Sequence, residues 1–323
     1  MLKHLVDRDV REPTQALRQR TAAVLLLAAA LLLAAALPWG VSAQRGAPAA
    51  SSAREALVDL PGVQLWFSDS GGAGEPVVFL HANTGTSEIW APQVAAFTRA
   101  GYRVITFDRR GWGKSTANPA TGPQPGTVAD DLDALASFLR LERFHLVGVA
   151  GGGFIALDYA AWRGERLLSL VVGASTGAVA DQPFQEMIRR LEIPGIRAQP
   201  AHYREVGPSY RATNPEGTAR WIAIHDRAQQ PGAIAQPLRS PNTFAKLETL
   251  GVRTLVVAAD ADLLAPPGLM SMWARHVKGA RWGVVPDAGH AVAWERPEAF
   301  DALVLPFLRG YSRLPLVRGL PGK

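Results

Sequence analysis

The sequence contains no cysteine in its 323 residues, and this absence removes several classes of function. Disulfide bonds, thiol catalysis and thiolate-bound metal sites all require cysteine. Runs of like charge are absent too: basic residues exceed acidic ones by a formal +6, but the excess is scattered along the chain. Scattered charge does not indicate a nucleic-acid partner. No internal repeat follows residue 53, so the remaining chain predicts one large globular domain.

The N-terminal 43 residues have a different pattern from the rest. An apolar run without charge covers residues 21–37, after a mixed but net basic stretch. Val41, Ser42 and Ala43 follow at the spacing that a signal peptidase recognises. We expect residues 1–43 to be a signal peptide, or an uncleaved membrane anchor, because the run is just long enough to span a bilayer. The Ala-, Pro- and Ser-rich residues 44–56 predict a linker.

This leader places the chain outside the cytoplasm. We expect a periplasmic or secreted protein. If the N-terminal helix stays uncleaved, that helix anchors the chain to the membrane. A domain helix is not expected over residues 21–37, because Pro38 and Gly40 follow the run directly.

From residue 57 onward, short β-rich runs alternate with helical patterns. This order predicts an α/β fold with a mostly parallel, eight-stranded sheet and helices on both faces. Pro61 and Gly62 predict a hairpin between the first two strands. The expected strands are 57–60, 63–68, 77–81, 103–107, 145–149, 168–173, 254–259 and 281–285. The expected helices are at about 88–99, 128–139, 152–162, 268–277 and 297–308.

Residues 176–250 interrupt this alternation. They contain no strand-like run and are rich in Pro, Arg, Gln and aromatic residues. We expect an inserted helical cap here, between core segments 57–175 and 251–310, with a tail at 311–323. Ligands of open α/β sheets bind beyond the carboxyl ends of the strands. A cap at that edge would enclose a small-molecule substrate, and its arginines would suit either an anionic ligand or a solvated surface.

Four motifs follow strands of the expected sheet in chain order. They are His-Ala-Asn-Thr-Gly at 81–85, Asp-Arg-Arg-Gly-Trp-Gly-Lys-Ser at 108–115, Gly-Val-Ala-Gly-Gly at 148–152, and Asp262 paired with His290. Together they resemble the α/β-hydrolase superfamily over nearly all of residues 57–309. The capped branch of haloalkane dehalogenases, epoxide hydrolases and C–C hydrolases is the most similar.

The third motif differs from the family pattern in one residue, which lacks the hydroxyl oxygen of the family's serine. The family carries Gly-x-Ser-x-Gly on a sharp strand-to-helix turn, with the nucleophile at its apex. Gly148 and Gly152 keep the small flanking positions here, but Ala150 stands at the apex. A methyl group has neither a lone pair nor an acidic proton, so Ala150 cannot attack a carbonyl.

The resemblance implies that the other catalytic groups are present. His290 is expected to face the turn, with Asp262 fixing its tautomer as in a triad, although Asp260 competes for that role. The amides of Asn83 and Gly151 match the family's oxyanion-hole positions. No cofactor is implied, and the cap histidines His202 and His225 lack the neighbours of a metal site.

The resemblance also suggests residues of the substrate pocket. The run from Asn83 to Trp90 is similar to the halide-binding loop of haloalkane dehalogenases and predicts a polar pocket. His81 fits either a structural hydrogen-bonding role or a place in that pocket. Ser175, at the end of a strand, is expected at the pocket and is a weak candidate for a substitute nucleophile.

Three functions remain open for such a site. The dyad of His290 and Asp262 could act as a general base, activating water or removing a substrate proton, and so act on an ester, a lactone or a C–C bond beside a carbonyl. Non-hydrolytic relatives such as hydroxynitrile lyases and cofactor-free dioxygenases use the same scaffold. The alternatives are a ligand-binding pseudoenzyme, or a serine hydrolase whose nucleophile was deliberately replaced.

Overall fold

The computed structural model describes residues 53–310. The predicted leader, most of the linker and the tail lie outside these residues, so they stay predictions. No helix within residues 53–310 is long and apolar enough to cross a bilayer.

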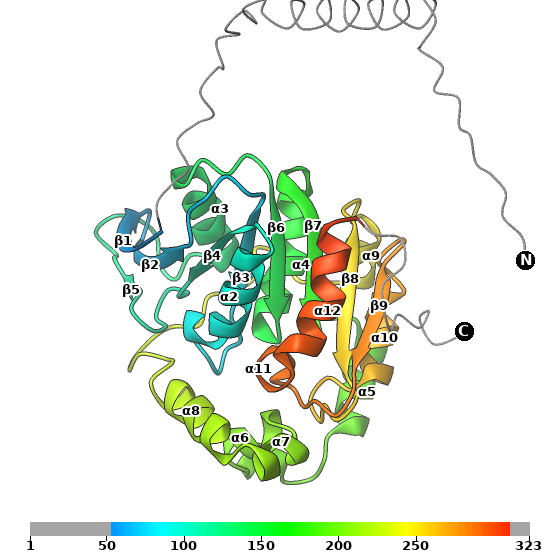
Figure 1. The fold of residues 1–323 in the computed structure, drawn as a ribbon. Coiled ribbons are helices and arrows are strands. Elements are labelled where there is room, and N and C mark those ends of the chain that lie inside the picture. Colours follow the sequence, from blue (N-terminus) through cyan, green and yellow to red (C-terminus); the bar gives the residue numbers. More distant parts are fainter. Residues whose placement is uncertain (1–52, 311–323) are drawn as a thin grey trace, which may run out of the picture. The chain divides into compact units, whose positions relative to one another are not determined.

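The strands of the described chain form one sheet of nine strands (Figure 1). Its order is β1-β2-β4-β3-β6-β7-β8-β9, with β5 paired to β2. Strand β2 runs antiparallel to β1, β4 and β5, and every other pair is parallel. The strands are β1 (Arg54–Leu60), β2 (Val63–Asp69), β3 (Pro76–Leu80), β4 (Arg103–Phe107), β5 (Thr116–Ala117), β6 (Phe144–Val149), β7 (Leu167–Gly173), β8 (Thr254–Ala259) and β9 (Arg281–Val285).

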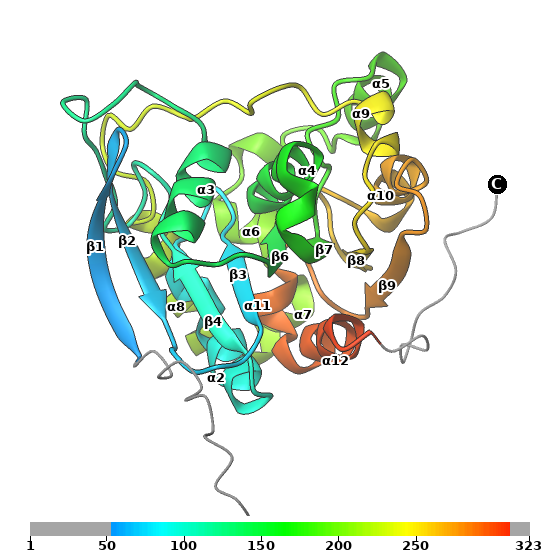
Figure 2. The same cartoon turned by 90° about the horizontal axis from the view of Figure 1, so that it is seen from above.

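Helices cover both faces of this sheet (Figure 2). On one face lie α3 (Val128–Phe138), α4 (Gly151–Arg163) and α10 (Pro267–Ala274), and on the other lie α2 (Ala91–Arg99), α11 (Val292–Glu295) and α12 (Pro297–Leu308). Each face has its own cluster of buried apolar side chains. The predicted α/β-hydrolase architecture is therefore present.

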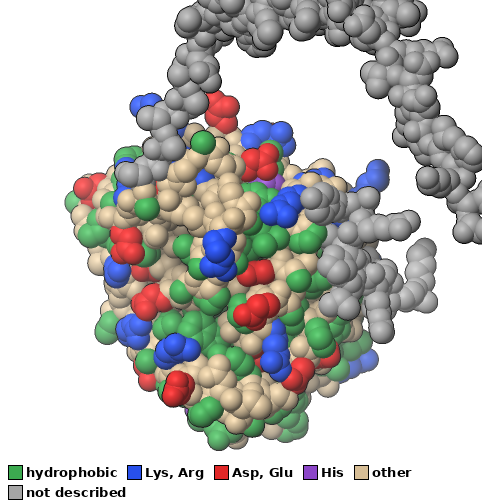
Figure 3. Space-filling model, viewed as in Figure 1, with side chains coloured by type: hydrophobic (Ala, Val, Ile, Leu, Met, Phe, Trp, Pro, Cys, Tyr) green, Lys and Arg blue, Asp and Glu red, His purple; other side chains and the backbone are tan. Residues whose placement is uncertain are grey.

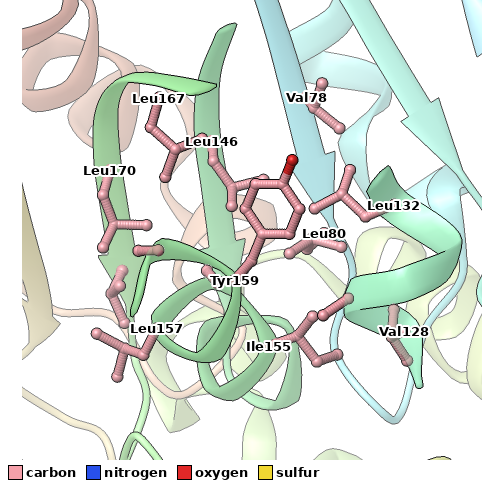
Figure 4. Packing of buried hydrophobic residues seen from close by; sticks show 14 of the residues in the cluster. Val78, Leu80, Val128, Leu132, Leu146, Ile155, Leu157, Tyr159, Leu167 and Leu170 are labelled. Carbon is pink, nitrogen blue, oxygen red and sulfur yellow. The ribbon is translucent and has the colours of Figure 1, made fainter. Parts of the chain in front are cut away.

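The local sequence explains why these strands and helices form where they do. Strand β6 is buried at every residue and is apolar apart from His145, as expected of a central parallel strand. Helix α3 begins where the Thr127 side chain accepts a hydrogen bond from the Asp130 amide at 3.1 Å. Ile155 and Tyr159 of α4 fill the space between the sheet and α3 (Figure 4).

Two features of the sheet differ from the expectation of eight strands. Strand β1 begins at Arg54, three residues earlier than predicted and inside the expected linker, because its exposed polar residues pair along β2 up to Asp69. Strand β5 consists of Thr116 and Ala117 only. Two exposed residues carry no periodicity, so the sequence gives no signal for such a strand.

The stretch between β7 and β8 is helical, and it has two parts. Its first helices, α5 to α8, lie beyond the carboxyl ends of the strands (Figure 1). Residues 227–243 then return along α3 and α4, where the Arg239 amide donates to Asp158 Oδ2 at 2.7 Å. The part that covers the strand ends is therefore shorter than residues 176–250. The helices are α5 (Gln182–Leu191), α6 (Ala201–Glu205), α7 (Pro208–Thr213), α8 (Pro215–Asp226) and α9 (Phe244–Glu248).

The surface in the view of Figure 3 carries basic and acidic side chains interspersed with apolar ones. Neither basic nor acidic side chains dominate this face.

Candidate active site

The turn between β6 and α4 keeps the strained geometry of a nucleophile elbow. Ala150 has φ +49° and ψ −118°, a conformation that costs a residue with a Cβ atom of the order of 1–3 kcal/mol. The strand and the helix approach so closely that a Cβ on Gly148 would lie 2.4 Å from the Gly152 carbonyl oxygen. A Cβ on Gly152 would in turn lie 2.3 Å from the carbonyl oxygen of Leu80. The elbow is therefore intact around an apex that has no functional group.

The nearby hydroxyl of Ser175 does not replace the missing one. Its side chain is fully buried, and its Oγ donates a hydrogen bond of 2.8 Å to the Ala150 carbonyl oxygen. The same Oγ accepts a hydrogen bond from the Gly177 amide at 3.1 Å. Ser175 thus supports the turn from inside the protein, and the prediction that it belongs to the pocket is corrected on this point. Thr176, the next residue, borders the larger cavity.

His290 and Asp262 form the pair that the sequence predicts. His290 Nδ1 lies 2.8 Å from Asp262 Oδ2, and Asp262 Oδ1 accepts hydrogen bonds from the amides of Leu264 and Ala265. Asp260 does not take part, since its Oδ1 accepts from the Asp287 amide. Asp262 therefore orients the ring and leaves Nε2 as the ring nitrogen available to a ligand.

The charge around this pair favours a protonated imidazole. Burial alone lowers the pKa of His290, but the charge and hydrogen bond of Asp262, aided by Glu205 and Glu295, raise it to about 9. Burial likewise opposes the charge of Asp262, yet the pKa of this carboxyl is lowered by His290 and by the two amides it binds. At neutral pH the pair is an imidazolium and a carboxylate.

The two predicted oxyanion-hole residues are adjacent. A Cβ on Gly151 would lie 2.3 Å from Asn83 Oδ1. Gly151 is the first residue of α4, so its amide has no acceptor within the helix and lies at the positive end of the helix dipole. Asn83 Oδ1 accepts a hydrogen bond of 2.9 Å from Arg109 Nη1.

Arg109 is a buried cation beside this loop. Burial lowers its pKa to about 9, and it forms no ion pair with any described residue. Its guanidinium stacks over Trp112 at 4.6 Å and donates to Asn83 and to the Ala82 carbonyl oxygen. Arg109 therefore fixes the loop and adds positive potential next to the Gly151 amide.

His81 is a structural residue of the oxyanion loop. It has no solvent exposure, its Nε2 accepts from the Arg109 amide at 3.0 Å, and its Nδ1 faces the Ala82 carbonyl oxygen at 2.8 Å. Burial, and then the charge of Arg109, lowers its pKa well below the ordinary value, so the ring is neutral. Of the two roles left open by the sequence, its contacts fit the structural one, and the predicted place in the substrate pocket is corrected.

Trp90 also lies away from the pocket. Its indole is fully buried and packs against Phe79 at 4.7 Å and against Phe300 at 6.4 Å between ring centroids. It borders neither cavity that reaches His290. The predicted likeness to a halide-binding loop therefore does not extend to this tryptophan, because the core between β3 and α12 takes up its side chain.

Two cavities meet at His290. The larger has a volume of about 370 Å³ and a wall with more apolar than polar residues, among them Phe154, Ile188 and Leu269. Its polar members are Asn83, Thr176, Arg204, His290 and the ion pair of Glu192 and Arg197. The smaller has a volume of only about 20 Å³. Its wall brings together the oxyanion loop, the end of β6 and the cap: Thr84, Val149, Glu205, Trp221 and His290.

The sequence does not single out two residues of this site, Arg204 and Glu205, as candidate pocket residues. They are consecutive on α6, and Arg204 borders the larger cavity whereas Glu205 borders the smaller. Arg204 forms no ion pair with any described residue, and its buried Nε has no hydrogen-bond partner. No motif marks them, because a cap helix of five residues shows no pattern that aligns it with the core.

The described residues contain no group of three or more histidine or acidic side chains that could hold a metal ion. The ring of His225 stacks on Trp221 at 5.4 Å, and that of His202 packs on Tyr203 at 4.6 Å. Both cap histidines therefore pack against aromatic neighbours.

Comparison with known proteins agrees with this geometry. Residues 77–303 match the family described as "Alpha/beta hydrolase family", and the chain belongs to that family. A protein from Mycobacterium tuberculosis named as a non-heme bromoperoxidase, BpoC, is 34% identical over 252 residues, covering 74% of this chain and 95% of that protein. A 2-hydroxy-6-oxononadienedioate/2-hydroxy-6-oxononatrienedioate hydrolase of Paraburkholderia phymatum is 29% identical over 270 residues, covering 76% and 91%.

Solved structures show the same relation. A thermophilic esterase from Thermogutta terrifontis, solved with malate bound, matches with a TM-score of 0.66 and 27% identity. That match covers 81% of this chain and all of the esterase chain. An enol-lactonase from Burkholderia xenovorans, 22% identical with a TM-score of 0.63, shares the fold.

Proposed function

We propose that this chain is a hydrolase that acts on a small carbonyl compound without forming an acyl-enzyme. The substrate is an ester, a lactone or a compound with a C–C bond beside a carbonyl. One observation carries the proposal: a buried pair of His290 and Asp262 faces cavities beside an intact elbow whose apex is a methyl group. Membership of the α/β-hydrolase family, with relatives named as hydrolases and esterases, supports it.

Water is the nucleophile in this mechanism. Without an oxygen on Ala150 no covalent intermediate forms there, so the attacking hydroxyl must come from solvent. The amides of Gly151 and Asn83 stabilise the negative oxygen that develops on the carbonyl, a contribution of about 10²–10³ per donor. Arg109 holds Asn83 in place for that task.

The dyad acts in its protonated form at neutral pH. With a pKa of about 9, only about 1% of His290 is neutral at pH 7, so its predicted role as general base is confined to alkaline solution. In the protonated state Nε2 donates its proton to the leaving group, and Asp262 stabilises the imidazolium until then. General acid–base catalysis of this kind contributes about 10²–10⁴ to the rate.

The larger cavity indicates the class of substrate. Its apolar wall suits an acyl or alkyl chain, and Arg204 supplies a cation without an acidic partner among the described residues. Arg204 is half-buried, and its buried Nε has no hydrogen-bond partner, so an anionic ligand would stabilise it. We therefore favour an amphipathic substrate with a carboxylate at the end remote from the reacting carbonyl.

A set of three proteins tests the proposal. Hydrolysis of p-nitrophenyl butyrate and of γ-butyrolactone is measured for the full chain, for His290→Ala and for Ala150→Ser. Turnover by the unsubstituted chain that falls at least about 10²-fold in His290→Ala supports the proposal. A chain that hydrolyses neither compound until Ala150→Ser is introduced contradicts it.

The methyl group of Ala150 also favours a second function, binding without turnover. A pseudoenzyme would keep the cavity of about 370 Å³ and its Arg204 but would not hydrolyse bound ligands. Calorimetric binding of a medium-chain dicarboxylate monoester that is recovered unchanged after incubation would identify that function.

We also propose that residues 1–43 direct export, with the folded part periplasmic or secreted, or tethered by an uncleaved N-terminal helix. The uncharged apolar run at 21–37 and the small residues at 41–43 support this placement.

A further inference from the structure

The carboxylate of Glu205 is held rigidly beside His290. Its side chain is 6% exposed, and its Oε2 accepts a hydrogen bond of 2.5 Å from Thr84 Oγ1 on the oxyanion loop. Its backbone carbonyl accepts a hydrogen bond of 2.8 Å from the amide of Ala291, the residue after His290. Both ends of Glu205 are therefore fixed to the two loops that form the site.

Glu205 and His290 both border a space that has the size of one water molecule. Both residues border the smaller cavity of about 20 Å³, and a water needs about 10–15 Å³ measured in this way. Within the described residues the two side chains form no ion pair within 4.0 Å of each other. The wall of this cavity includes the residues Thr84, Glu205 and His290, whose hydroxyl, carboxylate and imidazole are groups that can hydrogen-bond a water.

We propose that Glu205 is the general base that takes a proton from the attacking water. This role rests on the proposed hydrolase function and assigns the proton acceptor that His290, when protonated, cannot be. Nothing in the sequence of the core predicts it, because the carboxylate comes from cap helix α6.

The step balances in atoms and charge. An O–H bond of water breaks, its proton passes to a carboxylate oxygen of Glu205, and the hydroxyl oxygen bonds to the substrate carbonyl carbon. When the carbonyl reforms, the bond to the leaving group breaks and Nε2 of His290 transfers its proton to that group. The proton on Glu205 then returns to His290 through a second water, which restores both residues.

The surrounding charges support this division of roles. Three carboxylates face the imidazole: Asp262 from the loop after β8, Glu205 from α6 and Glu295 from α11. Burial raises the pKa of Glu295, whose Oε2 accepts hydrogen bonds of 2.9 Å from the amides of Gly207 and Gly289. Glu295 therefore fastens the cap to the histidine loop, and Glu205 is the carboxylate of the three that also borders the small cavity.

The loss of kcat in Glu205 variants and its chemical rescue test the assignment. For the full chain hydrolysing p-nitrophenyl butyrate, we expect kcat to fall along an alkaline limb near pH 9, where His290 loses its proton. Glu205→Gln should lower kcat by about 10²–10⁴ while this alkaline limb stays. Sodium formate should restore turnover to Glu205→Ala in proportion to its concentration, because formate can occupy the vacated position. Glu216→Gln, an exposed carboxylate on cap helix α8, is the matched control and should retain kcat.

The outcomes separate the two proposals. If the unsubstituted chain is active and His290→Ala is not, but Glu205→Gln keeps kcat within twofold, the assignment of Glu205 is wrong and the hydrolase function stands. A lower melting temperature and a lower kcat in Glu205→Gln and Glu205→Ala, with no rescue by formate, show a structural role and also overturn the assignment. If the unsubstituted chain hydrolyses neither p-nitrophenyl butyrate nor γ-butyrolactone, both proposals fail together.

Discussion

Ser175 Oγ donates a hydrogen bond of 2.8 Å to the carbonyl oxygen of Ala150. The hydroxyl that touches the elbow is thus committed to supporting its backbone, and it is fully buried while doing so. Because that contact leaves the apex of the turn as it is, the chemistry of the site depends on what stands at position 150.

The first prediction concerns that position. Ala150→Ser should give a serine that reacts with a fluorophosphonate probe in alkaline solution, where the pKa of His290, about 9, leaves a neutral imidazole. The backbone at 150 already has the strained angles of an elbow, and Gly151 supplies an oxyanion donor. Labelling is measured by mass spectrometry of the intact protein. Ala150→Gly is the control and should stay unlabelled, as should the unsubstituted chain. Equal labelling of all three proteins would show that another residue reacts.

The second prediction concerns the pH dependence of stability. Folding raises the pKa of His290 from 6.5 to about 9, so the stabilisation is fully present below pH 6.5 and is lost as the pH rises through 9. The shift corresponds to about 3 kcal/mol in the free energy of unfolding. Urea denaturation at pH 6 and pH 10 should show this loss in the unsubstituted chain. In His290→Gln the difference between the two pH values should be smaller by that amount, and an unchanged difference would contradict the pairing with Asp262.

Sequence patterns predict the core of this molecule well, and physical reasons explain where they stop. The central strands and the helices on both faces follow from continuous apolar runs and from helix caps such as Thr127. The contact between His290 and Asp262 follows from their positions after neighbouring strands β9 and β8. Contacts that depend on the folded cap, such as the one from Glu205 to Thr84 across 121 positions, leave no local pattern.

Burial explains the corrected pocket residues. His81 and Ser175 follow the ends of strands, and Trp90 ends a short 3-10 helix in the loop after β3, which is where a substrate pocket is expected. Each has no solvent exposure in the structure because the core or a backbone turn takes up its side chain. Composition at a strand end cannot distinguish a side chain that faces the cavity from one that turns beneath the loop.

The third prediction concerns Arg204. Replacing it with methionine, which keeps much of the length and removes the charge, should raise KM for the p-nitrophenyl ester of adipate about 10- to 100-fold. The reason is the loss of a charge-assisted contact worth about 1.5–3 kcal/mol. KM for the uncharged p-nitrophenyl butyrate should change less than threefold. Equal effects on both esters would mean that Arg204 only supports the fold.

The fourth prediction concerns the elbow's packing. Gly152→Ala should lower the free energy of unfolding by about 3 kcal/mol or prevent folding, because the added Cβ would lie 2.3 Å from the Leu80 carbonyl oxygen. Gly268→Ala, where an added Cβ meets nothing within 4 Å, is the control and should leave stability unchanged or slightly higher. Thermal unfolding followed by circular dichroism compares the two. A stable Gly152→Ala protein would show that β3 and α4 can separate without cost.

The fifth prediction concerns the leader. When the whole chain is expressed in a bacterium with a general secretory pathway, N-terminal sequencing of the exported protein should begin at Gln44. A protein that keeps Met1 and sediments with membranes indicates the uncleaved anchor. A protein that keeps Met1 in the cytosolic fraction would contradict export.

The position of helix α6 determines how an exchange of the cap would change this site. Arg204 and Glu205 are adjacent in the chain, yet each borders a different one of the two cavities that meet at His290. Exchanging a five-residue segment would therefore replace both the proposed substrate anchor and the proposed proton acceptor at once. A recombinant of this core with another relative's cap would keep its imidazole and its oxyanion loop and yet change both what it binds and whether it turns over. On these proposals, one short cap helix determines both which substrate binds and whether it is hydrolysed.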